Sequence, residues 1–141
     1  MKPVVLDASA AAAWLIPDER TDTADRFYQQ VRTQAARFHA PLLWHWETGN
    51  LLLMSFRRGR IEQAMFDQGL TLLGTCLIEF DPPPDAHRRS QILGLAGAHQ
   101  LTFCDAAYLE LCVRLNSQLA STDQALLRAA QRCGIERIAL D

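Results

Sequence analysis

Four acidic residues share one kind of position, at or just after the point where an extended segment gives way to a predicted helix. They are Asp7, Glu47, Asp105 and Asp123. A helix N-terminus favours negative charge by about 0.3–1 kcal/mol, so each acid taken alone can be a simple capping or first-turn residue. Asp7 and Asp123 follow predicted strands, and Glu47 and Asp105 fall in predicted first turns. The shared placement of all four is what suggests chemistry.

If the turns after the strands converge, the four carboxylates share one pocket. Two carboxylates about 4 Å apart repel by roughly 4 kcal/mol at an effective dielectric constant near 20. Lys2 is the only lysine, and it is not close in sequence to the acids. Such a cluster must hold protons or a cation, and a set of oxygen ligands without thiolates or paired histidines indicates Mg²⁺ or Mn²⁺. A divalent ion held by carboxylates and still carrying water is typical of phosphoryl-transfer sites.

The first apolar run explains how Asp7 would be positioned. Residues 4–6 form a short, continuous apolar run that is rich in β-branched side chains. Such a run predicts a strand buried on both faces in the middle of a parallel sheet. The alanine-rich residues 8–14 predict a helix, with Ser9 as its capping residue. Asp7 then lies at the carboxyl end of a central strand, where open α/β sheets place their ligand sites.

The rest of the chain continues the alternation of strand and helix. We expect short strands or extended segments at 39–41, 76–80, 118–121 and, as a last edge strand, 138–140. Helices are expected over 24–35, 44–56, 61–74, 85–98, 102–113 and 125–133. The helix over 44–56 has little polar face, so we expect it to be deeply packed. This order predicts one α/β domain spanning residues 1–141, a three-layer α/β/α sandwich with a mostly parallel central sheet.

Composition fits a cytoplasmic protein. The 141 residues are 49% apolar and 21% charged, with a net charge of −2, and no apolar run approaches the roughly 18 residues of a membrane span. Lys2 followed by Pro3 lacks the layout of a signal peptide. The cysteines show no C-x-x-C pair, which argues against a zinc knuckle or a disulfide framework and favours small core residues in a reducing compartment. The four are Cys76, Cys104, Cys112 and Cys133.

Several other side chains have two interpretations each. Arg57, Arg58 and Arg60 could hold phosphates or form a solvated helix end, and the same holds for Arg88 and Arg89. Trp14, Trp44 and Trp46 could stack on nucleobases or could belong to the core or a dimer interface. His45 and Glu47 form H-x-E, but the P-C-x-x-C segment of zinc deaminases is absent.

The acidic positions lie in motifs that resemble those of PIN-domain ribonucleases, most of all the small VapC-type toxins of bacterial toxin–antitoxin pairs. The first motif is Val4, Leu6, Asp7, Ala8 and Ser9; the second is Glu47 with Asn50; the third runs from Thr102 to Leu109; the fourth is Ala120-Ser121-Thr122-Asp123. The resemblance covers nearly the whole chain, and the third and fourth motifs are its most specific parts. Cys104 stands where an aromatic residue is frequent, and Trp44-His45-Trp46 is unusually bulky; neither removes a carboxylate.

The resemblance implies a metal-dependent endoribonuclease. Asp7, Glu47, Asp105 and Asp123 would form the acidic metal and catalytic site, with Ser9 and Thr122 as supporting polar groups. The expected cofactor is Mg²⁺, with Mn²⁺ as a substitute. The expected partners are an RNA substrate, a cognate antitoxin protein and a second copy of the chain in a homodimer, with no membrane.

Two alternatives from another class are a receiver-like regulatory module and a PIN-like domain that has lost activity. A receiver needs a lysine late in the chain, and Lys2 is the only lysine, which argues against it. A catalytically inactive PIN-like domain would act as a binding or regulatory module. All four acids are present, and this favours the enzyme.

Overall fold

The computed structural model describes residues 2–141 and has an all-parallel sheet of four strands in the order β3-β2-β1-β4. The strands are β1 (Val4–Leu6), β2 (Phe38–Pro41), β3 (Ile78–Asp81) and β4 (Gln118–Ala120). β1 has neighbours on both sides, and all three of its residues are fully buried. The predicted central strand is therefore confirmed.

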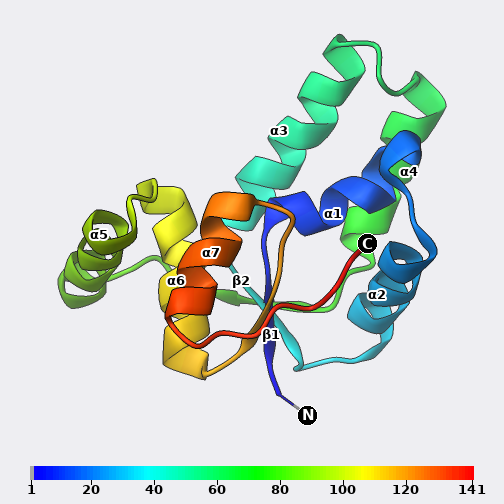
Figure 1. Ribbon diagram of the computed structural model, residues 1–141. Coiled ribbons are helices and arrows are strands. Elements are labelled where there is room, and N and C mark those ends of the chain that lie inside the picture. Colours follow the sequence, from blue (N-terminus) through cyan, green and yellow to red (C-terminus); the bar gives the residue numbers. More distant parts are fainter. Residues whose placement is uncertain (1) are drawn as a thin grey trace.

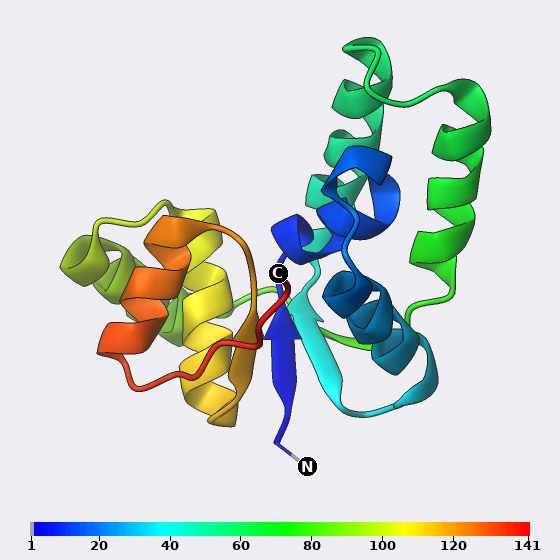
Figure 2. The same cartoon turned by 45° about the vertical axis from the view of Figure 1, so that its right-hand side comes forward.

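Within residues 2–141, seven α-helices and one short 3-10 helix connect or follow the strands. They are α1 (Ala8–Leu15), η1 (Pro17–Glu19), α2 (Asp22–Thr33), α3 (Leu43–Arg57), α4 (Gln63–Gly74), α5 (Ala86–His99), α6 (Phe103–Leu115) and α7 (Gln124–Arg132). Figure 2 shows α5, α6 and α7 on one side of the sheet and α1 to α4 on the other. The predicted three-layer α/β/α fold is thus confirmed.

The core lies between the sheet and these two helical layers. Val4, Phe38 and Leu119 contribute fully buried side chains from three neighbouring strands, and Leu109 packs against them from α6. α6 lies close to both β1 and β2, so it is the helix that crosses the middle of the sheet.

Helix α3 departs from the deep packing expected for it. Trp44, Thr48 and Leu52 are buried on one side, whereas Trp46, Leu53 and Phe56 are exposed. α3 and α4 form a helical hairpin that extends beyond the sheet (Figure 1), so only one side of α3 meets the rest of the molecule. The apolar sequence of α3 therefore covers an exposed face as well as a buried one.

The chain end also differs from expectation. The predicted edge strand at 138–140 is absent from the described residues, and a single parallel bridge joins Leu119 to Arg137 instead. The amide of Ile138 donates to the carbonyl of Leu119 at 2.8 Å, which holds this segment along β4. Within residues 2–141, no helix combines the length and apolar character that a membrane crossing needs.

Candidate functional site

Asp7 lies at the carboxyl end of β1 and is the N-cap of α1. Its Oδ1 accepts hydrogen bonds from the amide of Ala10 at 3.1 Å and from the hydroxyl of Ser9 at 2.6 Å. The expectation that Ser9 caps this helix is wrong, because Ser9 lies one residue inside α1 and binds the capping carboxylate instead. Asp7 is only 5% exposed. Asp7 is therefore both the cap of α1 and one of the four candidate site acids.

Ser121 holds the other oxygen of Asp7. Its hydroxyl donates to Asp7 Oδ2 at 2.5 Å and accepts from the amide of Asp123 at 3.0 Å. Thr122, the expected supporting hydroxyl, is exposed and contributes its main-chain amide, which donates to Ser9 Oγ at 2.8 Å. The side chain that contacts Asp7 is therefore that of Ser121, the residue before the predicted Thr122. The signal was present in the fourth motif, where both hydroxyls occur, but only the backbone direction after β4 separates them.

Asp123 and Asp105 are fixed by helix starts. Asp123 is the N-cap of α7, and its Oδ1 accepts from the amide of Leu126 at 3.0 Å. Asp105 lies in the first turn of α6, and its amide donates to the N-cap hydroxyl of Thr102 at 3.1 Å. Both placements agree with the sequence prediction. The two helices direct their positive ends toward these carboxylates, which stabilises negative charge there.

Glu47 lies one turn deeper in its helix than expected. α3 begins at Leu43, so Glu47 is its fifth residue and falls outside the first turn. Tyr108, which sequence reasoning did not assign, donates its hydroxyl to Glu47 Oε1 at 2.6 Å. This bond joins α3 to α6 across 61 residues of sequence and fixes the Glu47 carboxylate toward the other acids. Tyr108 belongs to the third motif and lies three residues after Asp105, so the two residues share a side of α6. This spacing is the only sequence signal that could have indicated a role for Tyr108.

The four carboxylates influence one another. Burial raises the pKa of Asp7 above its ordinary value, and repulsion from Asp123 adds to the rise, while the bonds from Ser121 and Ser9 oppose it. Burial also raises the pKa of Glu47, with added repulsion from Asp105 and Asp7. The pKa of Asp105 is raised by burial and by Asp123. These mutual repulsions place the four acids around one region at the carboxyl edge of the sheet.

No cationic side chain neutralises this region. Among residues 2–141, none of the four acids forms an ion pair with an arginine, lysine or histidine. A second group of acids, half-buried Asp81 and buried Glu110, shows the contrast: Arg114 lies 2.7 Å from both, and Arg88 contacts both. Although burial acts to raise it, these arginines lower the pKa of Asp81 overall. Arginines thus pair with Asp81 and Glu110, whereas the four candidate site acids have no such partner within residues 2–141.

The donor set fits a hard divalent cation that keeps much of its water. All four groups offer carboxylate oxygens, the ligands that Mg²⁺ prefers, and their mutual repulsion would be relieved by a cation. Within residues 2–141, no three acidic, histidine or cysteine side chains stand close enough together to form a ready metal cage. Mg²⁺ is commonly bound by one or two carboxylates plus water and substrate phosphate, so an open arrangement suits it.

The other candidate residues divide into buried or paired side chains and exposed ones. Trp44 is buried, and Trp14 packs on Phe27 and Tyr28 while its indole N–H donates to the carbonyl of Ala24. Trp46 is exposed. Arg88 is occupied by Asp81 and Glu110, and exposed Arg60 contacts Asp18 and Glu19. Exposed Arg57, Arg58 and Arg89 remain candidates for phosphate contact.

The cysteines are free, as expected, but one of them lies outside the core. Cys112 is buried, Cys76 and Cys133 are half-buried, and Cys104 is exposed beside Asp105. Burial together with the nearby Glu47 and Asp105 carboxylates raises the pKa of the Cys104 thiol. The neutral thiol is therefore favoured over the thiolate.

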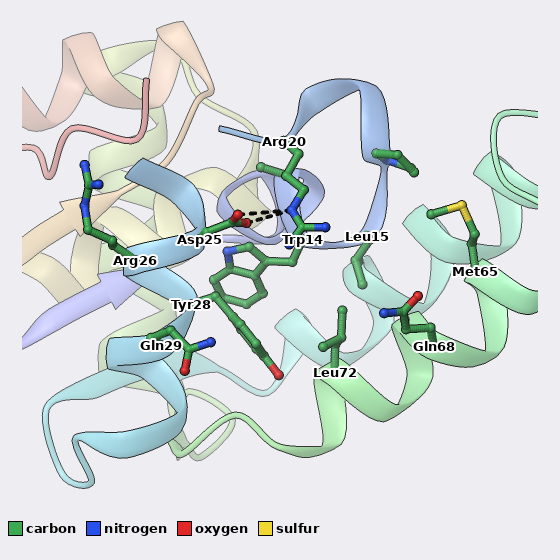
Figure 3. Close-up of a pocket in the computed structure, with 13 residues that line it drawn as sticks. Trp14, Leu15, Arg20, Asp25, Arg26, Tyr28, Gln29, Met65, Gln68 and Leu72 are labelled. Carbon is green, nitrogen blue, oxygen red and sulfur yellow. Dashed lines mark hydrogen bonds and ion pairs between the residues drawn. The ribbon is translucent and has the colours of Figure 1, made fainter. Parts of the chain in front are cut away.

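A separate cavity of about 310 Å³ lies between α1, α2 and α4 (Figure 3). Trp14 and Tyr28 form its apolar side, and Arg20 pairs with Asp25 at its rim, 3.0 Å apart. The four acids do not belong to its lining in the described part of the chain. This cavity is therefore distinct from the acidic region.

The parallel sheet and the unpaired acids at its carboxyl edge define a PIN-like protein, and comparison with known proteins identifies the family. The chain is 32% identical over 127 residues to Ribonuclease VapC3 of Pyrobaculum aerophilum, covering 87% of this chain and 91% of that protein. It belongs to the VapC family of PIN-domain ribonucleases. No protein-family model matches the chain.

A solved structure supports the fold independently. The crystal structure of PAE2754 from Pyrobaculum aerophilum is similar with a TM-score of 0.70 at 24% sequence identity. The similarity covers 96% of this chain and 83% of that one. The whole three-layer arrangement, including the α3/α4 hairpin, is therefore within the range of a known fold.

Proposed function

We propose that this protein is a metal-dependent endoribonuclease and the toxin of a toxin–antitoxin pair. The observation that carries the proposal is the group of four carboxylates without a cationic partner among residues 2–141, of which Asp7 is buried. One buried and three half-buried carboxylates that lack a cationic partner favour a ligand of opposite charge. The ribonuclease name of the relative supports RNA as the substrate.

The chain's own residues would act by holding and orienting. Asp7, Asp105 and Asp123 are the proposed direct or water-mediated ligands of Mg²⁺ or Mn²⁺, and Glu47 is either a further ligand or the group that orients the attacking water. When bound, the cation would polarise the scissile phosphate and lower the pKa of a bound water. Ser9 and Ser121 fix both oxygens of Asp7, so this carboxylate needs no reorganisation when a cation arrives.

The partners follow from the same assignment. We propose that the substrate is RNA in the cytoplasm, that a cognate antitoxin protein blocks the site, and that two copies form a homodimer. The VapC name of the relative supports an antitoxin partner. The four free cysteines suit a reducing compartment.

Cleavage of structured RNA by the purified protein tests the proposal. We expect cleavage with Mg²⁺ or Mn²⁺, loss of cleavage with a chelator, and loss in both Asp7→Asn and Asp105→Asn. Asp85→Asn is the matched control, because Asp85 is also a helix N-cap, accepting from the amide of Arg88 at 2.9 Å, but is exposed and caps α5, which carries none of the four acids. Cleavage should persist in that variant.

Metal binding gives a second readout that does not depend on finding the right RNA. A ligand that binds only the folded state raises the thermal midpoint, so Mg²⁺ or Mn²⁺ should stabilise the wild-type protein and Asp85→Asn more than Asp7→Asn. Absence of cleavage together with absence of this difference would contradict the enzyme and leave a PIN-like binding module.

A further inference from the structure

An apolar cavity of about 340 Å³ lies at the carboxyl ends of β2 and β3. The last residues of both strands border it, and helices α3, α5 and α6 close it. Its principal lining residues are Pro41, Trp46, Asp81, Ile92, Phe103 and Ala107. It has the size and the predominantly apolar lining of small-molecule sites.

This cavity adjoins the four acids. The strand order β3-β2-β1-β4 places the end of β2 directly beside the end of β1, which positions Asp7. Trp46 precedes Glu47 on α3, and Phe103 lies two residues before Asp105 on α6. A polymer that passes over the acids along this edge of the sheet therefore meets the cavity next.

Trp46 presents the recognition surface. It is 72% exposed, whereas Trp44, two residues earlier on the same helix, is 2% exposed and packs in the core. An exposed indole beside an apolar cavity is a stacking platform, and every nucleobase has a face that can stack on it. Exposed Phe103 adds a second aromatic side chain on the opposite helix.

One end of the cavity is polar. Asp81 and Arg88 both line it and form an ion pair with each other, so the empty cavity holds no uncompensated charge there. Arg88 also contacts Glu110, and Arg114 also binds Asp81, so the charges at this end are satisfied within the chain. The open apolar part of the cavity beside Trp46 is the part that would receive the flat face of a base.

We propose that this cavity is a nucleobase subsite, in which a base of single-stranded RNA next to the scissile phosphate stacks on Trp46. The proposal rests on the proposed ribonuclease function and names the part of its substrate that the protein grips beyond the phosphate. Trp46 is a binding and positioning residue here, since it lies beside the acids and not among them.

Binding titrations with labelled single-stranded poly(A), poly(C) and poly(U) test the subsite. They are carried out with Mg²⁺ in the Asp105→Asn protein, so that the RNA is not cut during the measurement. Trp46→Ala should weaken binding of at least one homopolymer about tenfold, the lower part of the range for loss of one stacked base. Trp46→Phe should retain affinity but lose the quenching of tryptophan emission that RNA produces in the parent.

Two controls isolate the base and the residue. Leu93→Ala, an exposed apolar residue on α5, should bind RNA like the parent. An abasic ribose-phosphate strand should bind the parent and Trp46→Ala equally, because the stacking partner is missing from the RNA. The thermal midpoint of Trp46→Ala should equal that of the parent, since the side chain is mostly exposed.

Equal RNA affinity of Trp46→Ala and its parent would overturn the proposal, as would an equal loss on the abasic strand. A change in oligomeric state or in antitoxin affinity without a change in RNA affinity would assign the cavity to a protein contact and also overturn it. Wild-type cleavage of RNA is measured separately. If the wild-type protein does not cleave RNA, the proposed nuclease function is contradicted, but the base stacking measured in these titrations is not.

Discussion

Replacing Tyr108 by phenylalanine removes one oxygen from the site and keeps the buried ring. Tyr108 is 1% exposed, and its hydroxyl donates to Glu47 Oε1 at 2.6 Å. A hydrogen bond to a charged group contributes about 1.5–3 kcal/mol. Glu47 is only half-buried, so water can replace part of the lost bond, and we expect a loss of about 1.5 kcal/mol at neutral pH. For a chain of this length, that lowers the thermal midpoint by about 5 °C.

The pH dependence of this loss has a defined sign. Burial, with repulsion from Asp105 and Asp7, raises the pKa of Glu47, while the Tyr108 bond acts to lower it. An acid whose pKa is higher in the folded state costs the fold stability as the pH rises from the unfolded pKa through the folded pKa. Tyr108→Phe raises the folded pKa of Glu47 further. The difference from wild type should therefore be largest at neutral pH and shrink below the ordinary carboxyl range, where Glu47 is protonated in both states.

Urea denaturation at several pH values measures this, with Tyr28→Phe as the matched control. The Tyr28 hydroxyl lies 2.6 Å from Thr75 Oγ1, so it forms a bond of equal length between two neutral groups. Tyr28→Phe should cost about 1 kcal/mol at every pH. In cleavage assays, the acid limb of the pH profile should move to higher pH only in Tyr108→Phe. A loss in Tyr108→Phe that is as independent of pH as that of Tyr28→Phe would refute the reasoning.

Two further pairs of variants test the support of the site and of the fold. Ser121→Ala should lower the free energy of unfolding by about 2 kcal/mol, because it leaves a buried Asp7 oxygen and the Asp123 amide without their partner. In the same urea titration, Thr122→Ala should change the free energy of unfolding by less than about 0.5 kcal/mol, because Thr122 is exposed. Arg114→Met should lower the free energy of unfolding by about 2–3 kcal/mol, because it removes an arginine partner of buried Glu110. Arg137→Met should hardly change the thermal midpoint, because the ion pair of Arg137 with Asp141 is exposed. Equal effects within either pair would contradict the assignment.

The sequence predicted best what depends on short-range pattern. The run over 4–6 identified β1 as central because continuous burial leaves no polar face, and Asp7, Asp105 and Asp123 were placed at helix starts correctly. α3 was misjudged because a helix with many apolar residues does not reveal which side meets a neighbour. Its exposed Trp46 is visible as a special residue only once the α3/α4 hairpin is seen to extend beyond the sheet.

The identity of supporting residues depends on geometry that no local pattern contains. Whether Ser121 or Thr122 reaches Asp7 is decided by the direction of the backbone as it leaves β4, where adjacent side chains point to opposite sides. The bond between Tyr108 and Glu47 joins two helices whose approach is set by the packing of α6 across the sheet. Both contacts follow from the tertiary arrangement and could not be read from spacing.

Charge pairing separates the candidate site acids from Asp81 and Glu110 more sharply than burial does. Glu110 and Asp7 are equally buried, at 5% exposure each, yet Glu110 lies between two arginines and Asp7 is held by serines. Arginine pairing offsets the desolvation of a structural acid within the folded chain. Hydroxyl groups orient Asp7 without supplying a charge. Their hydrogen bonds do not fully offset the effect of burial, so the pKa of Asp7 stays raised. A cation from solution is the group that would offset the remainder of that effect, which is why the unpaired acids, and not the most buried ones, indicate the site.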